Sequence, residues 1–404
     1  MQNNAETLLK VEHLCQYFRA GTFETKAVDD VSFEIKRGEV FGLVGESGCG
    51  KTTTGRSIIK LYNITSGNVI FKGIRIAAGK RSYKEAIKQA RAEYAEGVKA
   101  NPEKSAELKA KRDAIIAEQK KLMKAADYDQ KNCDKEFSKQ LVEECKAKYK
   151  PLIEGAMSEE QKQALTKEYK NELHKAKHTK LVTQIQMIFQ DPIASLDPRM
   201  TVREIIAEGL KIQGERDEKV IDEKVYEMLE LVGLVREHAS RYPHEFSGGQ
   251  RQRIGVARSV IMNPELIIAD EPVSALDVSV QAQVINLLND LREKFGLTIL
   301  FVAHDLSVVK YFSDRIGVMY FGKMVELADS DELFLNPMHP YTKSLLSAIP
   351  LPDPIYEKTR KRITYNPLAE HDYTTDKPSF REIKPGHFVM CNDAEFARYQ
   401  SELK

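Results

Sequence analysis

Residues 45–52 limit the possible folds of this 404-residue chain more than any other segment. They match the pattern G-x-x-x-x-G-K-[ST], follow an apolar run at residues 40–44 and precede helix-forming residues. In such a loop backbone N–H groups surround phosphates, Lys51 reaches the β and γ oxygens, and the Thr52 hydroxyl can bind Mg²⁺. One match of this kind can arise by chance, but the strand before it and the helix after it favour an α/β protein that binds a nucleotide.

The bulk composition is that of a globular protein without a strongly charged partner. Hydrophobic residues make up 42% and charged residues 30%, enough for one large core or two modest ones. A net charge of +1 gives no reason to expect nucleic acid. The five cysteines lack C-x-x-C spacing, as expected of reduced thiols in a cytosolic protein. Apolar runs such as residues 297–303 are too short to span a bilayer, so other chains would have to hold this one at a membrane.

Changes of composition divide the chain into four parts. Residues 6–79 predict strands at 28–35 and 40–44 and a helix after Gly50. Residues 80–180, rich in Lys, Glu, Ala and Gln, predict a helical insertion. Residues 181–335 contain apolar runs at 185–189, 266–269 and 297–302, typical of parallel strands buried on both faces. Residues 336–404 are Pro-rich and are expected to form an irregular appended tail.

Several signals place helix boundaries inside the insertion. Ser82 and Ser158 each stand three residues before a Glu or Gln, which is the spacing of a capping box, and Pro102 and Pro151 mark places where helices can start or stop. These signals predict four helices arranged as a hairpin or a small bundle. Disorder is the rival interpretation because the charge density is high, although a structureless connection of this length is improbable inside a compact domain.

Two carboxylates end the apolar run at residues 266–269. Asp270 can hold the magnesium shell and Glu271 can polarise an attacking water. The simpler interpretation is a pair of acids at the end of a strand. The phosphate loop upstream favours the catalytic pair.

The segment Ser247-Gly248-Gly249-Gln250 precedes a predicted helix at residues 254–261. The free N–H groups of a helix start can bind an anion. Taken alone, this segment is better explained as an ordinary helix start that contains glycine.

Six motifs in one order resemble those of ABC-type ATPases. They are the phosphate loop, Gln190 in Phe-Gln-Asp, the Ser-Gly-Gly-Gln segment, Asp270-Glu271, residues 274–277 and His304. The resemblance covers nearly all of the chain outside the insertion. It implies an α/β fold with a RecA-like core, an antiparallel β part at the start and a helical lobe around residues 201–250. It also implies that each active site forms between two ATPase domains.

The resemblance implies a role for each matching residue. Glu271 resembles the general base, His304 the γ-phosphate sensor, and Gln190 the residue that contacts Mg²⁺ and the attacking water. Thr52, Gln190 and Asp270 are expected around Mg²⁺. The residues expected to contact ATP are Phe18, Gly45, Glu46, Ser47, Gly48, Cys49, Gly50, Lys51, Thr52, Thr53, Ser247, Gly248, Gly249, Gln250 and Asp277.

The adenine-stacking residue is left between two neighbours. Phe18 falls where the family stacks an aromatic ring on adenine, but the loop up to Ala27 leaves the register open, so Tyr17 is the alternative. A core aromatic is an equally good interpretation of either residue.

Residues 189–202 and 336–350 resemble the ATPases of oligopeptide, dipeptide and nickel importers, particularly their second ATPase subunit. The resemblance implies ATP hydrolysis that drives uptake of oligopeptides or dipeptides. The implied partners are a second ATPase subunit, two transmembrane permeases and an extracytoplasmic peptide-binding protein, with this chain on the cytoplasmic face of the membrane. A nickel or other small-solute importer is the alternative, and a non-transport ABC ATPase is less favoured. The tail lacks the cysteine-rich segment of this branch, so no iron–sulfur cluster is expected.

Overall fold

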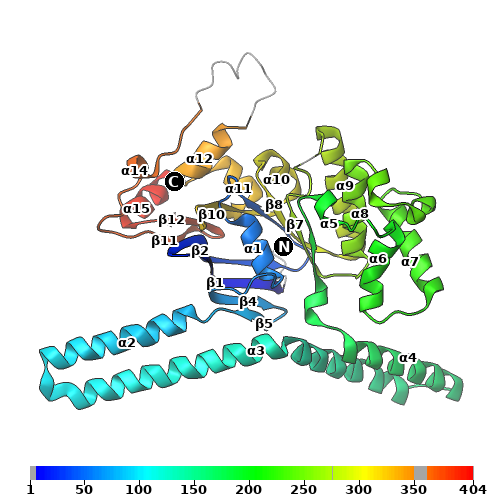
Figure 1. Cartoon of the computed structure of the whole chain (residues 1–404), viewed down its shortest axis with the longest axis horizontal. Helices are drawn as coiled ribbons and strands as arrows, with labels where there is room; N and C mark the ends of the chain where they lie inside the picture. The colour runs from blue at the N-terminus through cyan, green and yellow to red at the C-terminus, as the bar shows by residue number, and fades with distance from the viewer. Residues whose placement is uncertain (1–5, 275, 350–361, 404) are drawn as a thin grey trace.

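The computed structural model of the protein describes residues 6–274, 276–349 and 362–403. The body of the molecule holds two sheets, a helical lobe lies beside it, and the insertion runs along the opposite side from the tail (Figure 1). Ala275, within the motif of residues 274–277, and residues 350–361 of the tail lie outside the described residues. Among the helices described, none combines the length and the apolar character needed to cross a membrane.

The smaller sheet is antiparallel and begins the chain. Its order is β2-β1-β4-β5. The strands are β1 (Thr7–Ala20), β2 (Phe23–Lys36), β4 (Ser66–Phe71) and β5 (Ile74–Ala78). This sheet lies over one face of the larger sheet, because Leu9, Ile35 and Phe71 share an apolar cluster with Leu43 and Leu300.

The larger sheet carries the phosphate loop and has the order β11-β12-β10-β9-β3-β8-β7-β6. Its strands are β3 (Val40–Val44), β6 (Ile185–Ile188), β7 (Leu266–Asp270), β8 (Thr298–Ala303), β9 (Arg315–Tyr320), β10 (Lys323–Asp329), β11 (Ser379–Lys384) and β12 (His387–Cys391). Strands β6, β7, β8, β3 and β9 pair in parallel, so the loops after them meet at one edge. Successive residues of β3 alternate between two apolar clusters, which explains why its sequence is a continuous apolar run.

Helix α1 (Lys51–Ile58) lies on the same side as the smaller sheet, because its Ile58 belongs to the apolar cluster of Leu9 and Leu43. Other helices cover the opposite face of the larger sheet and form the lobe. Their bounds are α5 (Pro192–Ser195), α6 (Val202–Ile212), α7 (Glu218–Leu231), α8 (Gly248–Val260), α9 (Val278–Phe295), α10 (Leu306–Phe312) and α11 (Ser330–Leu335). Helices α6, α7, α8 and α9 share one apolar cluster with alternate residues of β3, β7 and β8. The lobe and the sheet therefore form a continuous core.

The tail is ordered where it is described, so the expectation of an irregular tail was wrong. It contains α12 (Pro340–Ser347), α14 (Pro367–Glu370) and α15 (Asp393–Glu402), and its strands β11 and β12 extend the larger sheet. Pro340 and Pro367 each stand at the start of a helix, where the missing N–H costs nothing. Prolines that suggested irregular chain are thus helix-start signals.

The insertion contains α2 (Arg81–Ala100), α3 (Ser105–Glu154) and α4 (Glu159–His178) rather than the four helices expected. Helix α3 continues through Pro151, because this proline lies in the last turn, where losing one N–H donor is tolerated while α4 packs alongside. Ser158 caps α4 through the N–H of Gln161, as predicted. The capping box expected at Ser82 is wrong, because α2 begins one residue earlier, at Arg81.

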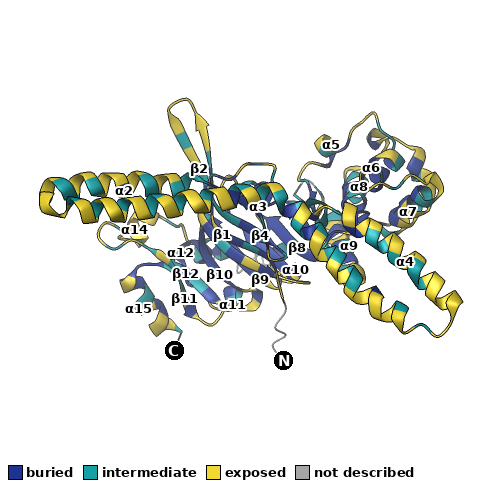
Figure 2. Ribbon diagram, turned by 90° about the horizontal axis from the view of Figure 1, so that it is seen from below, coloured by how far each residue is buried: buried dark blue, intermediate teal, exposed yellow. Residues whose placement is uncertain are grey.

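Helix α3 is 50 residues long, about 75 Å at 1.5 Å per residue, and pairs with α2 along its first part and with α4 along its last part. Its middle rests on the body, where Ala126, Cys133 and Phe137 are buried, while most of α2 and α4 is exposed (Figure 2). The predicted hairpin or bundle is in fact two hairpins that share one helix.

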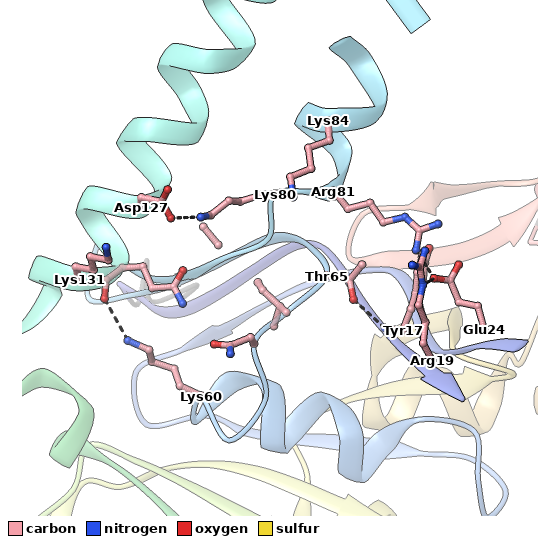
Figure 3. A pocket seen from close by; sticks show the side chains of 14 residues that line it. Tyr17, Arg19, Glu24, Lys60, Thr65, Lys80, Arg81, Lys84, Asp127 and Lys131 are labelled. Carbon is pink, nitrogen blue, oxygen red and sulfur yellow. Dashed lines mark hydrogen bonds and ion pairs between the residues drawn. The ribbon is translucent and has the colours of Figure 1, made fainter. Parts of the chain in front are cut away.

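Ion pairs join the insertion to the antiparallel sheet. Arg75 of β5 pairs with Asp129 of α3 at 2.6 Å, and Lys80 pairs with Asp127 (Figure 3). Beside them lies a cavity of about 850 Å³ between β1, α2, α3 and the segment after α1, with Lys60 and Lys131 in its lining. This segment follows the C-terminal end of α1, whereas the phosphate loop precedes its N-terminal end. The cavity therefore lies away from the phosphate loop, where the insertion meets the antiparallel sheet.

Candidate active site at the carboxyl edge of the parallel strands

The phosphate loop connects β3 to α1 and depends on its glycines. Gly45, Gly48 and Gly50 all have positive φ. A Cβ on Gly45 would lie 2.2 Å from the carbonyl oxygen of Met319, and a Cβ on Gly50 would lie 2.2 Å from that of Ala27. Side chains are excluded at both positions, so the loop can curl with its backbone N–H groups available.

Lys51 lies inside this loop. Its side chain is buried, and the ammonium donates hydrogen bonds to the carbonyl oxygens of Gly45 at 2.7 Å and Glu46 at 3.0 Å. It also lies 4.0 Å from Glu271 Oε1. A buried cation beside a ring of backbone N–H groups is suited to bind the phosphates of a nucleotide.

Asp270 lies at the end of β7 and is fully buried. Its Oδ1 accepts a 2.7 Å hydrogen bond from Thr52 Oγ1, and its Oδ2 has no hydrogen-bond partner among the described residues. Burial raises the pKa of this carboxyl group. A hydroxyl beside a carboxylate oxygen that lacks a protein partner fits the hard oxygen ligands that Mg²⁺ takes.

Glu271 receives two side chains from neighbouring strands. Its Oε2 lies 3.1 Å from Gln190 Nε2, after β6, and 3.1 Å from His304 Nδ1, after β8. Glu271 has φ of 43°, and its N–H donates to the carbonyl oxygen of Val302, which fixes the unusual backbone. Side chains after two parallel strands, β6 and β8, thus meet the carboxylate that follows the strand between them, next to Lys51.

The Ser-Gly-Gly-Gln segment lies in the helical lobe, at the start of α8. Ser247 accepts from the N–H of Gln250, and Gln250 accepts from the N–H of Ser247, which completes a capping box. A Cβ on Gly249 would lie 2.5 Å from Val280 Cγ1 of α9, so the two helices approach closely here. Asp277 is the N-cap residue of α9. Within residues 6–274, 276–349 and 362–403, neither the segment 247–250 nor Asp277 forms a hydrogen bond with the phosphate loop.

Tyr17 and Phe18 occupy different surroundings. The Tyr17 hydroxyl donates to Asp29, and Lys26 and Arg81 lie over its ring at 5.2 and 5.0 Å. Phe18 is 38% exposed and meets Tyr62 edge to face at 5.2 Å. Phe18 therefore offers the more open aromatic surface.

One contact to the phosphate loop was missed by the sequence reasoning. The N–H of Glu46 donates a 3.0 Å hydrogen bond to the hydroxyl of Tyr341, in α12 of the tail. The available signal was the family resemblance of residues 336–350, which includes Tyr341 but does not say what that side chain touches.

The chain matches two known families. The family described as ABC transporter matches residues 28–166 and 146–274. The family described as oligopeptide/dipeptide transporter, C-terminal region, matches residues 325–378.

Three relatives resemble the chain over almost its whole length. The oligopeptide transport ATP-binding protein OppF of Bacillus subtilis (strain 168) is 48% identical over 395 residues, 98% of this chain and 99% of that protein. AmiF of Streptococcus pneumoniae serotype 4, also an oligopeptide transport ATP-binding protein, is 42% identical over 99% of both chains. The dipeptide transport ATP-binding protein DppF of Lactococcus lactis subsp. cremoris is 42% identical over 93% of this chain and 90% of that protein.

Two solved structures share the fold. One is the ATP-binding cassette MJ0796 in a dimeric post-hydrolysis state bound to ADP and Pi, with a TM-score of 0.51 and 21% identity over 80% of this chain and 99% of that one. The other is cbiO1 from Clostridium perfringens, with a TM-score of 0.50 and 20% identity over 82% and 91%. At these identities the likeness concerns the fold alone.

Proposed function

This chain belongs to the ABC transporter family, and we propose that Glu271, Gln190 and His304 carry out its ATP hydrolysis at the edge where β6, β7 and β8 end. The chain is the ATP-hydrolysing subunit of an importer for oligopeptides or dipeptides. The observation that carries the site assignment is the approach of Gln190 and His304 to the same oxygen of Glu271, within reach of the buried Lys51.

Nucleotide binding follows from the loop and the first turn of α1. The backbone N–H groups of the loop and the ammonium group of Lys51 hold the phosphates, and Phe18 stacks on adenine. Thr52, Asp270 and Gln190 would hold Mg²⁺, which would supply positive charge to balance the phosphate oxygens. Asp270 can do so only as the carboxylate, so binding of the cation opposes the effect of burial on its pKa.

Hydrolysis needs a base beside the γ-phosphate. Glu271 accepts a proton from water as the water oxygen bonds to the γ-phosphorus and the bond to the β–γ bridging oxygen breaks. Gln190 orients the water through its amide, and His304 donates to a γ-phosphate oxygen. Both side chains also contact Glu271 itself, which keeps the three groups within hydrogen-bond range of one another.

The second half of the site comes from another ATPase domain. Ser247, Gly248, Gly249 and Gln250 present a helix start away from the phosphate loop of the same chain, which suits an anion held by a partner. Asp277 lies beside them at the start of α9. The partner is a second ATPase subunit, and two permeases together with an extracytoplasmic peptide-binding protein complete the importer. The chain then sits peripherally on the cytoplasmic face of the membrane.

The test is ATP turnover and uptake by the assembled importer, isolated from host membranes with this chain tagged. Glu271→Gln should retain ATP binding and lose both turnover and uptake of a labelled oligopeptide. Recovery without a second ATPase and permeases, or unchanged turnover in this variant, would contradict the proposal. Uptake of Ni²⁺ instead of peptide would assign the same machinery to a different solute.

A further inference from the structure

The tail reaches the phosphate loop through one buried hydroxyl. Tyr341 is 1% exposed, and its hydroxyl accepts a 3.0 Å hydrogen bond from the N–H of Glu46, the second residue of the loop. The preceding Gly45 has the carbonyl oxygen of Met319 against its α-carbon. The start of the loop is therefore held between the end of β9 and the tail.

This hydrogen bond is linked to the lysine that meets phosphate. Lys51 Nζ donates to the carbonyl oxygens of Gly45 and Glu46, the two residues at the start of the loop. A shift of Glu46 therefore moves acceptors of Lys51 and changes where its ammonium lies. The Tyr341 hydroxyl is thus linked through Glu46 to the Lys51 ammonium group, which binds the nucleotide.

Tyr341 itself is fixed by aromatic neighbours and by a helix cap. Its ring centroid lies 4.4 Å from that of Tyr320 and 5.6 Å from that of Tyr365. The Tyr341 N–H donates to Nδ1 of His339, which caps α12. A side chain held at both its ring and its backbone can act as a rigid support.

A buried carboxylate fastens this part of the tail to the larger sheet. Glu326 of β10 is fully buried and accepts from the N–H groups of Met338 at 2.7 Å and His339 at 3.1 Å. It also lies 2.8 Å from Nε2 of His387 in β12. The entry to α12 is thus bonded to β10 through a carboxylate that also contacts β12, so the position of Tyr341 follows from the sheet.

We propose that Tyr341 is a positioning residue for ATP, which holds the start of the phosphate loop through Glu46 and thereby makes the tail part of the nucleotide site. The proposal rests on the assignment of this loop and Lys51 to ATP binding. It gives the segment matched by the C-terminal transporter family a physical task in the ATPase reaction.

Tyr341→Phe tests the hydroxyl alone, and Tyr365→Phe is the matched control. Tyr365 belongs to the same aromatic cluster, but its hydroxyl forms no hydrogen bond with the residues that the structure describes. The measurements are the affinity of the full-length chain for a fluorescent ATP analogue, and KM and kcat of the assembled importer. Tyr341→Phe should weaken affinity and raise KM by about three- to tenfold, with kcat changed by less than about twofold. Tyr365→Phe should change neither.

Amide hydrogen exchange of residues 44–48 is a second readout. Exchange should be faster in Tyr341→Phe and unchanged in Tyr365→Phe, with similar melting temperatures for both. Wild-type affinity and exchange in Tyr341→Phe would overturn the inference, as would equal effects of the two variants. Lys51→Ala distinguishes failure of this inference from failure of the proposed function. If it abolishes ATP binding while Tyr341→Phe has no effect, only this inference fails; if it leaves binding intact, the proposed function fails.

Discussion

Thr52 Oγ1 donates a 2.7 Å hydrogen bond to Asp270 Oδ1 and so joins the end of the phosphate loop to the end of β7. The second oxygen of this carboxylate is buried without a partner in the described part of the chain. This corner combines a hydroxyl, a carboxylate and low solvent access, and its preference for a proton or for a divalent cation can be measured.

Asp270→Asn should stabilise the protein at pH 7 when no nucleotide or Mg²⁺ is added. Burial raises the folded-state pKa of Asp270, so its contribution to stability is complete below the unfolded pKa and is lost as pH rises through the folded pKa. Above that range the folded state carries a buried charge. The amide avoids this cost, roughly 1–3 kcal/mol, and should raise the melting temperature by a few degrees.

The control is Asp290→Asn, an exposed carboxylate on α9. Its melting temperature should follow the wild type at every pH. Mg²⁺ with ATP should stabilise the wild type more than Asp270→Asn. A lower melting temperature for Asp270→Asn at pH 7 would show that the buried carboxylate of Asp270 does not reduce the stability of the folded protein.

Glu271→Gln should reduce ATP turnover of the assembled importer by about 10²–10⁴-fold, the usual contribution of a general base. The amide preserves the shape and can still meet Gln190 and His304, so ATP affinity should stay within about threefold of the wild type. Steady-state turnover and equilibrium binding give the two numbers. Glu227→Gln changes an exposed carboxylate of α7 and should have wild-type turnover. Substantial turnover in Glu271→Gln would assign the base elsewhere.

Gly249→Ala should lower turnover by about 10- to 100-fold, because the new Cβ would lie 2.5 Å from Val280 Cγ1 and push α8 from α9. Val280 is β-branched and cannot swing away easily. Gly255→Ala in the same helix meets no atom within 4 Å and should leave turnover unchanged while stabilising α8 by about 0.5–1 kcal/mol. Equal turnover in both variants would argue against a tight α8–α9 contact.

Phe137→Ala should destabilise the protein by about 3–5 kcal/mol, because Phe137 is 2% exposed and joins α3 to the body. Lys72 Nζ also lies 4.8 Å from its ring centroid and would lose this contact. Chemical denaturation measures the change. Leu152→Ala removes a half-exposed side chain from the same helix and should cost less than about 1 kcal/mol. If the two variants are equally stable, α3 does not depend on the body for its position.

The larger sheet could be predicted because its strands are buried on both faces. Apolar runs such as residues 266–269 are then continuous, and the loop at 45–52 leaves few alternatives for the strand before it. The closeness of Gln190, Glu271 and His304 follows from the same topology, because the ends of parallel strands meet.

The insertion and the tail were harder to predict because long-range contacts determine them. Pro151 is a local stop signal, yet packing against α4 carries α3 past it. Strand β12 pairs with β10, a partner far away in the sequence, and β11 then pairs with β12. The hydrogen bond between Glu46 and Tyr341 spans 295 positions and depends on the position of α12, which no local pattern specifies.

The unbroken course of α3 has a mechanical consequence. Its middle is seated on the body at Ala126, Cys133 and Phe137, and each arm carries its own companion helix. Because α3 is a continuous helix supported near its centre, a displacement of its end beside α2 is expected to move its end beside α4 in the opposite direction. The chain leaving α4 leads within a few residues to β6 and then to Gln190. Force applied at the far end of the insertion thus has a direct route to the strand that precedes Gln190.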